Sequence, residues 1–240
     1  MTPGLDTVQQ MTELRLIGRG RAADVFDLGD GRVLRRYRSP RASAEAEARA
    51  MQHLRAHGVP VPEVFSADGD DMVMERLDGP TMMESLRSRP WRAASIGRRL
   101  AELQSLVHRV PAGGLDLRRI GEGDSVLHFD LHPDNVIVTA RGPVIIDWSN
   151  VAVGDPLADV MYSWLIMATS SPDAVPVLLR PLVGRIRRSL TDAFVARVPL
   201  DDDARRWVTR VAELRLADPN AFEHEKARVR EFAAAHGVVD

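Results

Sequence analysis

Short apolar runs separated by glycines mark the first part of the chain. Residues 14–37 contain the runs LRLIG, ADVFDLGDG and RVLRRY, and a Gly-Asp-Gly sequence at 29–31 lies between the last two. Runs of this length with turn residues between them are typical of antiparallel strands. We therefore predict two or three strands joined by tight turns in this region.

The next segment has a helical pattern. Residues 42–57 are rich in alanine and contain no helix breaker before Gly58, which predicts a helix. Glu47, Met51 and Leu54 fall on one face at i, i+4 and i+7, so a single glutamate is expected on the inward stripe. VPVPEVF then reads as extended chain, and 72–79 (MVMERLDG) reads as a further strand that leaves through a Gly-Pro break.

Helical patterns predominate beyond Gly79, and 93–110 is the clearest helix. One exception is a hairpin, in which NVIV and PVIIDW flank a turn at 140–142. From 154 onward the pattern is helical again, with Asp155 as a plausible N-cap. We predict an α+β, bilobal fold with a small antiparallel-sheet lobe at 1–77 and a mostly helical lobe at 78–240.

Composition narrows the class of protein. Of 240 residues 45% are hydrophobic, and 32 lysines and arginines nearly balance 34 aspartates and glutamates. This balance predicts neither a nucleic acid nor an anionic membrane as partner. The chain has no cysteine, its start lacks a signal-peptide layout, and no apolar run reaches the roughly 18 residues of a spanning helix. We expect a soluble, cytoplasmic protein, and the sequence does not predict its oligomeric state.

The strongest chemical signal lies in VLHFDLHPDNVIVTARGPVIIDW, residues 126–148. Asp130 and Asn135 occupy an irregular loop, and the hairpin is expected to end at Asp147 and fold it back beside them. One amide oxygen and two carboxylates then converge, and a few hard oxygen ligands suit Mg²⁺ completed by substrate phosphates. The spacing H-x-D-x-x-x-x-N followed by an aspartate matches the kinase signature, in which Asp130 is the catalytic base and Asn135 and Asp147 hold the metal.

The motifs HFDLHPDNVIV, VIIDW and GDPLADV together resemble the aminoglycoside phosphotransferase family of small-molecule kinases, which have the protein-kinase-like fold. The usual family pattern is His-Gly-Asp-Leu-His-Pro-x-Asn, then Ile-Asp-Trp or Ile-Asp-Phe, then Gly-Asp-Pro. Phe129 stands where glycine is usual, and Ser149-Asn150 follow Trp148 where an acidic residue is frequent. Neither departure removes the base or a metal ligand.

The same reading assigns roles to residues of the first lobe. GRGRAADVF from Gly18 has two of the three glycines of a phosphate-covering loop, Gly18 and Gly20, although taken alone such a segment is more often a plain hairpin turn. Arg35 stands where the kinase strand lysine is expected, and the only lysine of the chain is Lys226. The planar guanidinium would contact phosphates with a different geometry from an ammonium.

Two further positions complete the predicted nucleotide site. Glu47 matches the partner glutamate of the strand cation. The backbone near Glu75 and Leu77 resembles the hinge that hydrogen-bonds adenine. The resemblance implies transfer of the γ-phosphoryl group of ATP, or GTP, to a hydroxyl of a small molecule with Mg²⁺.

Other classes stay open at this stage. The arginine at position 35 is consistent with a nucleotide-binding regulatory module of the same fold without catalysis. A protein kinase is disfavoured, since no Ala-Pro-Glu segment is present and little room for an activation loop lies between Asp147 and Gly154. His128 and His132 around Asp130 also suggest a zinc hydrolase, but that reading gives Asn135 and Asp147 no role.

The acceptor is not predicted by these motifs. Aminoglycosides, macrolides, choline, homoserine and sugars are all phosphorylated by kinases of this plan. The acidic stretches at 201–207 and 222–232 are candidates for binding a polycationic acceptor, and a solvated helix face or an N-cap explains them more simply.

Overall fold

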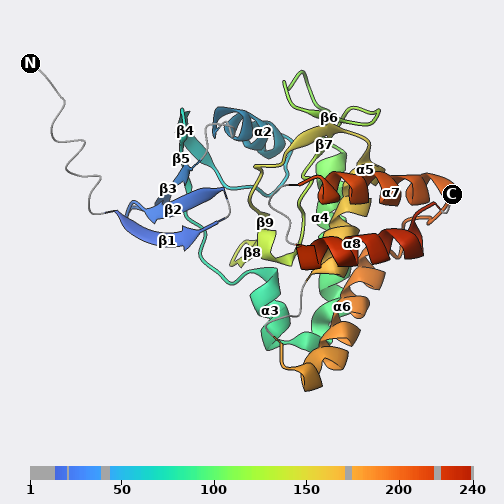
Figure 1. Cartoon of the computed structure of the whole chain (residues 1–240). Coiled ribbons are helices and arrows are strands. Elements are labelled where there is room, and N and C mark those ends of the chain that lie inside the picture. The colour runs from blue at the N-terminus through green and yellow to red at the C-terminus, as the bar shows by residue number, and fades with distance from the viewer. Residues whose placement is uncertain (1–13, 21, 39–43, 171–174, 219–222, 239–240) are drawn as a thin grey trace, which may run out of the picture.

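A computed structural model of the chain describes residues 14–20, 22–38, 44–170, 175–218 and 223–238. An antiparallel sheet lies at one side of the molecule and most of the helices lie at the other (Figure 1). The α+β class and the kinase-like arrangement predicted from the sequence are therefore confirmed. Arg21 of the predicted phosphate loop, residues 42 and 43 of the predicted helix, and Phe222 of the second acidic stretch lie outside the described residues.

The N-terminal sheet has five strands within the described residues, in the order β1-β2-β3-β5-β4, and all its neighbours are antiparallel. The turn glycines Gly29 and Gly31 adopt φ values of 90° and 77°, which side chains with a Cβ rarely tolerate. Its strands are β1 (Arg15–Arg19), β2 (Ala23–Asp27), β3 (Arg32–Tyr37), β4 (Val64–Asp68) and β5 (Asp71–Glu75).

Helix α2 (Ala44–Ala56) follows β3 and buries the predicted stripe. Glu47, Met51 and Leu54 are 2%, 1% and 0% exposed, so the glutamate does lie on the inward face. The strand predicted over 72–79 ends earlier, at Glu75. Its partner β3 begins at Arg32, and the amide of Arg76 donates instead to the Gly31 carbonyl in the preceding turn at 2.9 Å.

The segment after β5 leads into the helical part. Gly79 passes so close to β8 that an added Cβ would lie 2.2 Å from the carbonyl oxygen of Val138. Helix α3 (Met82–Ser88) then begins with a capping box between Thr81 and Glu84. The predicted division into 1–77 and 78–240 falls between β5 and α3 and stays a prediction.

Two small sheets support the motif region. The predicted hairpin is present and pairs Val136 with Ile145 through Thr139 with Gly142. Strand β10 lies between β6 and β7 in a three-stranded sheet that the sequence patterns did not predict. The strands are β6 (Arg119–Ile120), β7 (Ser125–Leu127), β8 (Val136–Thr139), β9 (Gly142–Ile145) and β10 (Ala152–Gly154), and one 3-10 turn, η3 (Pro133–Asn135), precedes β8.

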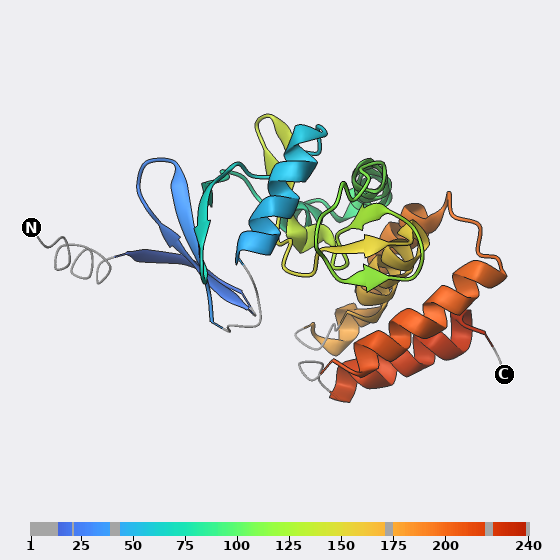
Figure 2. The same ribbon diagram turned by 90° about the horizontal axis from the view of Figure 1, so that it is seen from above.

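Five helices of the described chain surround this region, and α7 and α8 run side by side (Figure 2). Asp155 caps α5 as predicted, accepting from the Leu157 amide at 2.9 Å. The other elements of this part are η2 (Pro90–Arg92) and η4 (Val177–Leu179). The helices are α4 (Ala93–His108), α5 (Pro156–Thr169), α6 (Arg180–Val195), α7 (Asp202–Leu216) and α8 (Glu223–His236).

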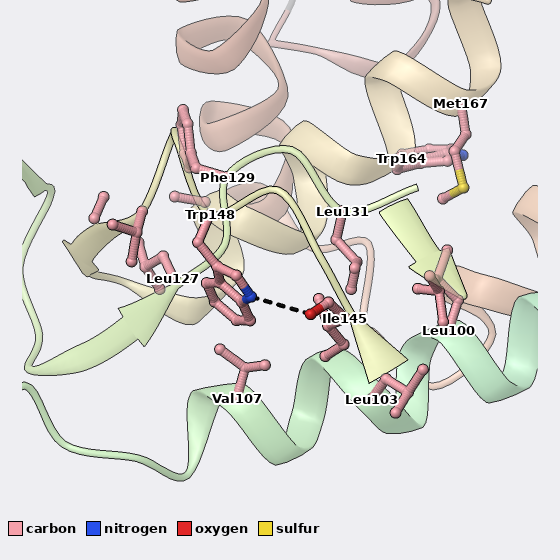
Figure 3. Packing of buried hydrophobic residues seen from close by; sticks show 14 of the residues in the cluster. Leu100, Leu103, Val107, Leu127, Phe129, Leu131, Ile145, Trp148, Trp164 and Met167 are labelled. Carbon is pink, nitrogen blue, oxygen red and sulfur yellow. Dashed lines mark hydrogen bonds between the residues drawn. The ribbon is translucent and has the colours of Figure 1, made fainter. Parts of the chain in front are cut away.

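The core sits where α4 meets the motif region (Figure 3). Leu100 and Leu103 of α4 are fully buried, as are Leu131 and Trp148. The Trp148 indole donates to the carbonyl of Ile145 at 3.2 Å, which satisfies its only donor inside the core. The apolar residues of the motif thus pack against α4 and fix the position of the loop and the hairpin. No described helix combines the length and the apolar character needed to cross a membrane.

Candidate active site

The hairpin brings the residues of the motif together. The Ile146 amide donates to the Asn135 carbonyl at 3.0 Å, which continues the β8–β9 pairing by one step. Asp147 therefore follows directly beside Asn135. The sequence predicted that Asp147 ends the second strand, and this was wrong: β9 ends at Ile145, and Asp147 has a φ of 62°.

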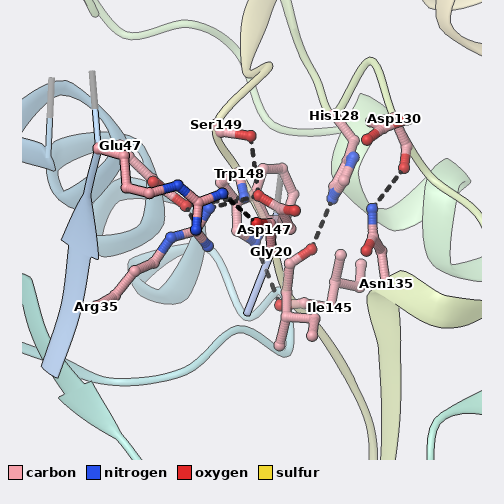
Figure 4. Close-up of polar contacts among 12 residues, drawn as sticks. Gly20, Arg35, Glu47, His128, Asp130, Asn135, Ile145, Asp147, Trp148 and Ser149 are labelled. Carbon is pink, nitrogen blue, oxygen red and sulfur yellow. Dashed lines mark hydrogen bonds and ion pairs between the residues drawn. The ribbon is translucent and has the colours of Figure 1, made fainter. Parts of the chain in front are cut away.

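The left-handed backbone at Asp147 turns its side chain across the cleft toward β3. Asp147 Oδ1 accepts from Arg35 Nη2 at 2.6 Å and from the Ser149 hydroxyl at 2.8 Å (Figure 4). Burial disfavours the charge, but Arg35 outweighs it and lowers the pKa of Asp147 below its ordinary value. Both hydrogen bonds use Oδ1, and 38% of the side chain is exposed, so Oδ2 is left for another partner.

Arg35 links the two parts of the molecule. Its Nη1 lies 3.3 Å from Glu47 Oε1 and its Nη2 contacts Asp147, while only 9% of its side chain is exposed. Burial opposes its charge, yet the two carboxylates together raise the pKa of Arg35. The sequence prediction that Glu47 faces Arg35 agrees with this geometry.

Glu47 has a second partner, since its Oε1 accepts from the Trp148 amide at 2.9 Å. Its other oxygen is buried and has no hydrogen-bond partner among the described residues. Burial dominates over the attraction of Arg35 and raises the pKa of Glu47 to about 7. The pKa of Asp147 is therefore lowered, which favours its ionised form, whereas the pKa of Glu47 is raised, which favours its protonated form.

Asp130 and Asn135 occupy the loop that leads into β8. The Asn135 amide nitrogen donates to the Asp130 carbonyl oxygen at 2.9 Å, which fixes the loop and leaves the Asn135 side-chain oxygen as an acceptor (Figure 4). Burial raises the pKa of the Asp130 carboxyl, while His132 and His128 partly offset this effect. A carboxylate with a raised pKa is suited to accept a proton.

Asp159 on α5 was not singled out from the sequence, although it lies in the GDPLADV motif. It is fully buried and accepts from the amides of His128 at 3.0 Å and Phe129 at 2.8 Å, and from His108 at 2.8 Å. Burial raises its pKa, but these partners outweigh burial, so the pKa of Asp159 is lowered. Phe129 has a φ of 58°, and Asp159 holds the loop in this unusual conformation immediately before Asp130.

One cleft of about 2270 Å³ joins these groups. Its volume exceeds that of an ordinary single-ligand pocket, so there is room for two substrates side by side. The first three strands and the turn after β1 contribute Gly18, Gly20 and Arg35 to its lining, the end of β5 and the segment after it contribute Glu75 and Leu77, and the motif contributes Asp130, Asn135 and Asp147. Of the predicted site residues, Glu47 alone does not line the cleft. It forms an ion pair with Arg35 on the side away from the cleft lining.

The predicted adenine contacts are partly occupied. The Glu75 amide donates to the Glu63 carbonyl at 2.8 Å, and its carboxylate pairs with Arg141. The Leu77 amide forms no hydrogen bond with other described residues and lies at the cleft. Between β1 and β2 the Gly20 amide donates to the Ala23 carbonyl at 2.9 Å, at the predicted glycine-containing loop. Its role as a phosphate cover stays a prediction.

The donor atoms fit Mg²⁺ better than zinc. Asn135 and Asp147 offer two hard oxygens to the same cleft, and the described residues contain no cluster of three histidine, aspartate or glutamate side chains that would form a complete metal site. Two protein ligands are typical of Mg²⁺ bound together with a phosphate. His128 Nε2 donates to the Ile146 carbonyl, and His132 Nδ1 accepts from the Asp134 amide. The two histidines therefore serve the loop.

Solved structures that share this fold include aminoglycoside phosphotransferases and a choline/ethanolamine kinase family protein. A thermostable mutant of aminoglycoside phosphotransferase APH(4)-Ia, in ternary complex with ADP and hygromycin B, has a TM-score of 0.67 and 13% identity over 98% of this chain and 99% of that chain. The GDP complex of aminoglycoside 2'-phosphotransferase-IIIa has a TM-score of 0.60 and 14% identity, covering 95% and 96%. A choline/ethanolamine kinase family protein from Mesorhizobium loti has a TM-score of 0.55 and 19% identity, covering 92% and 86%. No curated protein sequence matches the chain.

The fold and the cleft thus define a protein of the protein-kinase-like class. The model of the phosphotransferase enzyme family (APH) matches residues 13–125 and 117–182. The chain belongs to this family, as the sequence motifs indicated.

Proposed function

We propose that the protein transfers the γ-phosphoryl group of ATP, or of GTP, to a hydroxyl group of a small molecule. The observation that carries this proposal is the shared cleft, which Asp130, Asn135 and Asp147 line together with Arg35 of the N-terminal sheet, and in which Arg35 pairs with Asp147. Membership of the phosphotransferase family supports it. A loose, in-line phosphoryl transfer needs positioned reactants and neutralised charge more than it needs covalent chemistry from the protein.

Asp130 acts on the acceptor. Its carboxylate orients the acceptor hydroxyl and takes its proton as the oxygen attacks the γ-phosphorus. The raised pKa of Asp130 supports this role, because a carboxylate near the operating pH accepts a proton more readily. The loop geometry imposed by Asp159 keeps the carboxylate pointed into the cleft.

Arg35 acts on the nucleotide. Its guanidinium binds the α- and β-phosphates and is oriented by Glu47, and the Gly18–Ala23 hairpin covers the same groups. Asn135 and Asp147 would hold Mg²⁺, which would supply neutralisation of the phosphate charge. The backbone around Glu75 and Leu77 receives the adenine, with the unbonded Leu77 amide as its donor.

The test compares Asp130→Asn with Asp124→Asn, in which the same change is made at an exposed aspartate outside the cleft. ATP turnover is measured with Mg²⁺ across a panel of hydroxylated small molecules. We expect Asp130→Asn to fold normally and to lose about 10²- to 10⁴-fold in turnover, and Asp124→Asn to keep its turnover. Unchanged turnover in Asp130→Asn removes Asp130 from the mechanism.

A catalytically weak nucleotide-binding module is the second candidate. The direct ion pair of Arg35 with Asp147 favours it, because the pair occupies a cation and a carboxylate that phosphotransfer needs. ATP consumption that is measurable in the wild type and abolished by Asp147→Ala decides for the enzyme. Nucleotide binding without consumption, unaffected by that change, decides for the module.

A further inference from the structure

Three side chains form a stack next to Asp130. The rings of Phe129 and Tyr162 lie parallel, with 4.4 Å between centroids and 13° between planes. The guanidinium carbon of Arg118 lies 4.9 Å from the Phe129 centroid. All three side chains line the cleft, whereas the neighbouring Arg119 does not.

Phe129 is the unusual member of this stack. It occupies a left-handed backbone conformation, at the position where the family motif has glycine. Glycine would adopt this φ without strain, so the backbone gives no reason for a phenylalanine. Its ring is only 3% exposed and supplies the surface on which Arg118 rests. The departure from glycine therefore creates a contact that a glycine-containing motif lacks.

The charge of Arg118 is only partly offset, by Coulomb attraction from the buried carboxylate of Asp159. Its Nη2 donates to the Asn150 carbonyl at 3.0 Å, and it forms no ion pair with any carboxylate in the described parts of the chain. The buried carboxylate behind it, Asp159, is bonded to His108 and two amides instead. Burial lowers the pKa of Arg118, but a guanidinium stays cationic near neutral pH. Stacking and one hydrogen bond thus hold a cation in place with its charge available.

Two acidic residues of the lining are already engaged, although Asp130 and Asp134 also line the cleft. Asp218 and Glu225 lie 3.0 and 3.3 Å from the nitrogens of Arg215, which also bonds the Tyr162 hydroxyl. Arg187 adds another cation to the lining and donates to the Ser170 carbonyl at 2.9 Å. The acidic stretch at 201–207 does not line the cleft, and Asp201 is the N-cap of α7. A polycationic acceptor would therefore meet cations here.

We propose that Arg118, held over the ring of Phe129, binds an anionic group of the acceptor. The acceptor is then a small hydroxylated molecule that carries a carboxylate or a phosphate near the hydroxyl presented to Asp130. This inference rests on the phosphotransferase function proposed above. It narrows the acceptor class by excluding polycations such as aminoglycosides as preferred substrates.

The experiment uses matched pairs of acceptors that differ in the anionic group. A carboxylate arm compares glycerate with its amide, and a phosphate arm compares glucose 6-phosphate with glucose. Hygromycin B serves as a cationic acceptor. Phosphorylation is followed by ADP release with Mg²⁺ and ATP. We expect the anionic member of at least one pair to have a kcat/KM at least 10-fold above that of its neutral partner, and the arm identifies which anion is bound.

Variants then assign the preference to Arg118. We expect Arg118→Gln to raise the KM of the anionic acceptor by about 10- to 100-fold, as for a lost charged hydrogen bond, with kcat changed much less and the KM for ATP unchanged. Arg118→Lys should recover part of the preference, and the control Arg119→Gln should behave as the wild type. Phe129→Gly relieves the backbone and removes the platform, so it should raise the same KM without changing that of the neutral partner.

Three results overturn the subsite. Preference for neutral or cationic acceptors contradicts it and leaves the proposed phosphotransfer intact. A preference for anions that persists in Arg118→Gln assigns the anion to another group. If no acceptor is phosphorylated, the proposed function fails, and calorimetric binding of the anionic acceptors is compared between the wild type and Arg118→Gln; equal binding then excludes the subsite as well.

Discussion

Replacing Glu47 by glutamine tests the balance of forces in the cluster of Arg35, Glu47 and Asp147. Glu47 is 2% exposed, its Oε2 has no partner among the described residues, and its pKa is raised to about 7 from an ordinary value of 4.5. Burial therefore outweighs the attraction of Arg35. The folded protein binds a proton at this site that the unfolded chain has already released at the same pH.

The sign of the effect on stability follows from this difference. Because the folded state holds the proton more tightly, the contribution of Glu47 is largest below pH 4.5 and is lost as pH rises toward about 7. A pKa difference of this size corresponds to about 3 kcal/mol in full, of which about 2 to 3 kcal/mol falls between pH 5 and pH 8. Glutamine keeps the shape and hydrogen-bonding capacity of the neutral acid but does not titrate.

The assay is urea unfolding of the wild type and Glu47→Gln at several pH values from 5 to 8. We expect the free energy of unfolding of the wild type, relative to that of the variant, to fall by about 2 to 3 kcal/mol over this range. Glu45→Gln, on the exposed side of the same helix, should show no such trend. A difference that stays flat, or that grows with pH, means that Arg35 keeps Glu47 ionised and refutes the reasoning.

Three other outcomes follow from the structure. Asp159→Asn should destabilise the fold by about 2 to 4 kcal/mol in thermal unfolding. The two oxygens of Asp159 each accept from a buried backbone amide, and asparagine keeps only one of these acceptors. An unchanged Tm contradicts this. Gly97→Ala should lower the Tm although alanine favours helices, because its Cβ would lie 2.2 Å from the Leu190 carbonyl oxygen on α6, and a raised Tm shows that the helices separate easily. The kcat of the enzyme should fall with decreasing pH at a midpoint above the ordinary aspartate pKa of 3.8, because burial raises the pKa of Asp130; a profile without this acid limb excludes Asp130 as the base.

Much of the site was readable from local pattern. The spacing of Asp130, Asn135 and Asp147 around a Gly-containing turn predicted a hairpin that folds the acid back, and the register of β8 and β9 agrees with it. The helical period placed Glu47 with Met51 and Leu54 on the buried face. These features depend on contacts between residues that are close in the sequence. Such contacts require apolar side chains at regular helical or strand spacing, which can be recognised in the sequence.

Other features are absent from any local pattern. The strand predicted to reach Asp147 stops at Ile145, because a left-handed turn directs the carboxylate toward Arg35, 112 positions earlier. Asp159 bonds amides about thirty positions earlier. A buried acid of this kind looks in sequence like any polar residue on a helix.

The sequence alone therefore determined the α+β class, the N-terminal antiparallel strands with the helix that follows them, and the hairpin of the motif, whereas the base, ligands and cation that it names stay predictions. The tertiary structure alone decided how their charges are shared: Asp147 ionised against Arg35, Glu47 with a raised pKa, and Arg118 stacked on Phe129 with its charge available. The physical reason is that burial and Coulomb interaction depend on distances across the assembled fold. Residue identity and periodicity carry no information on those distances.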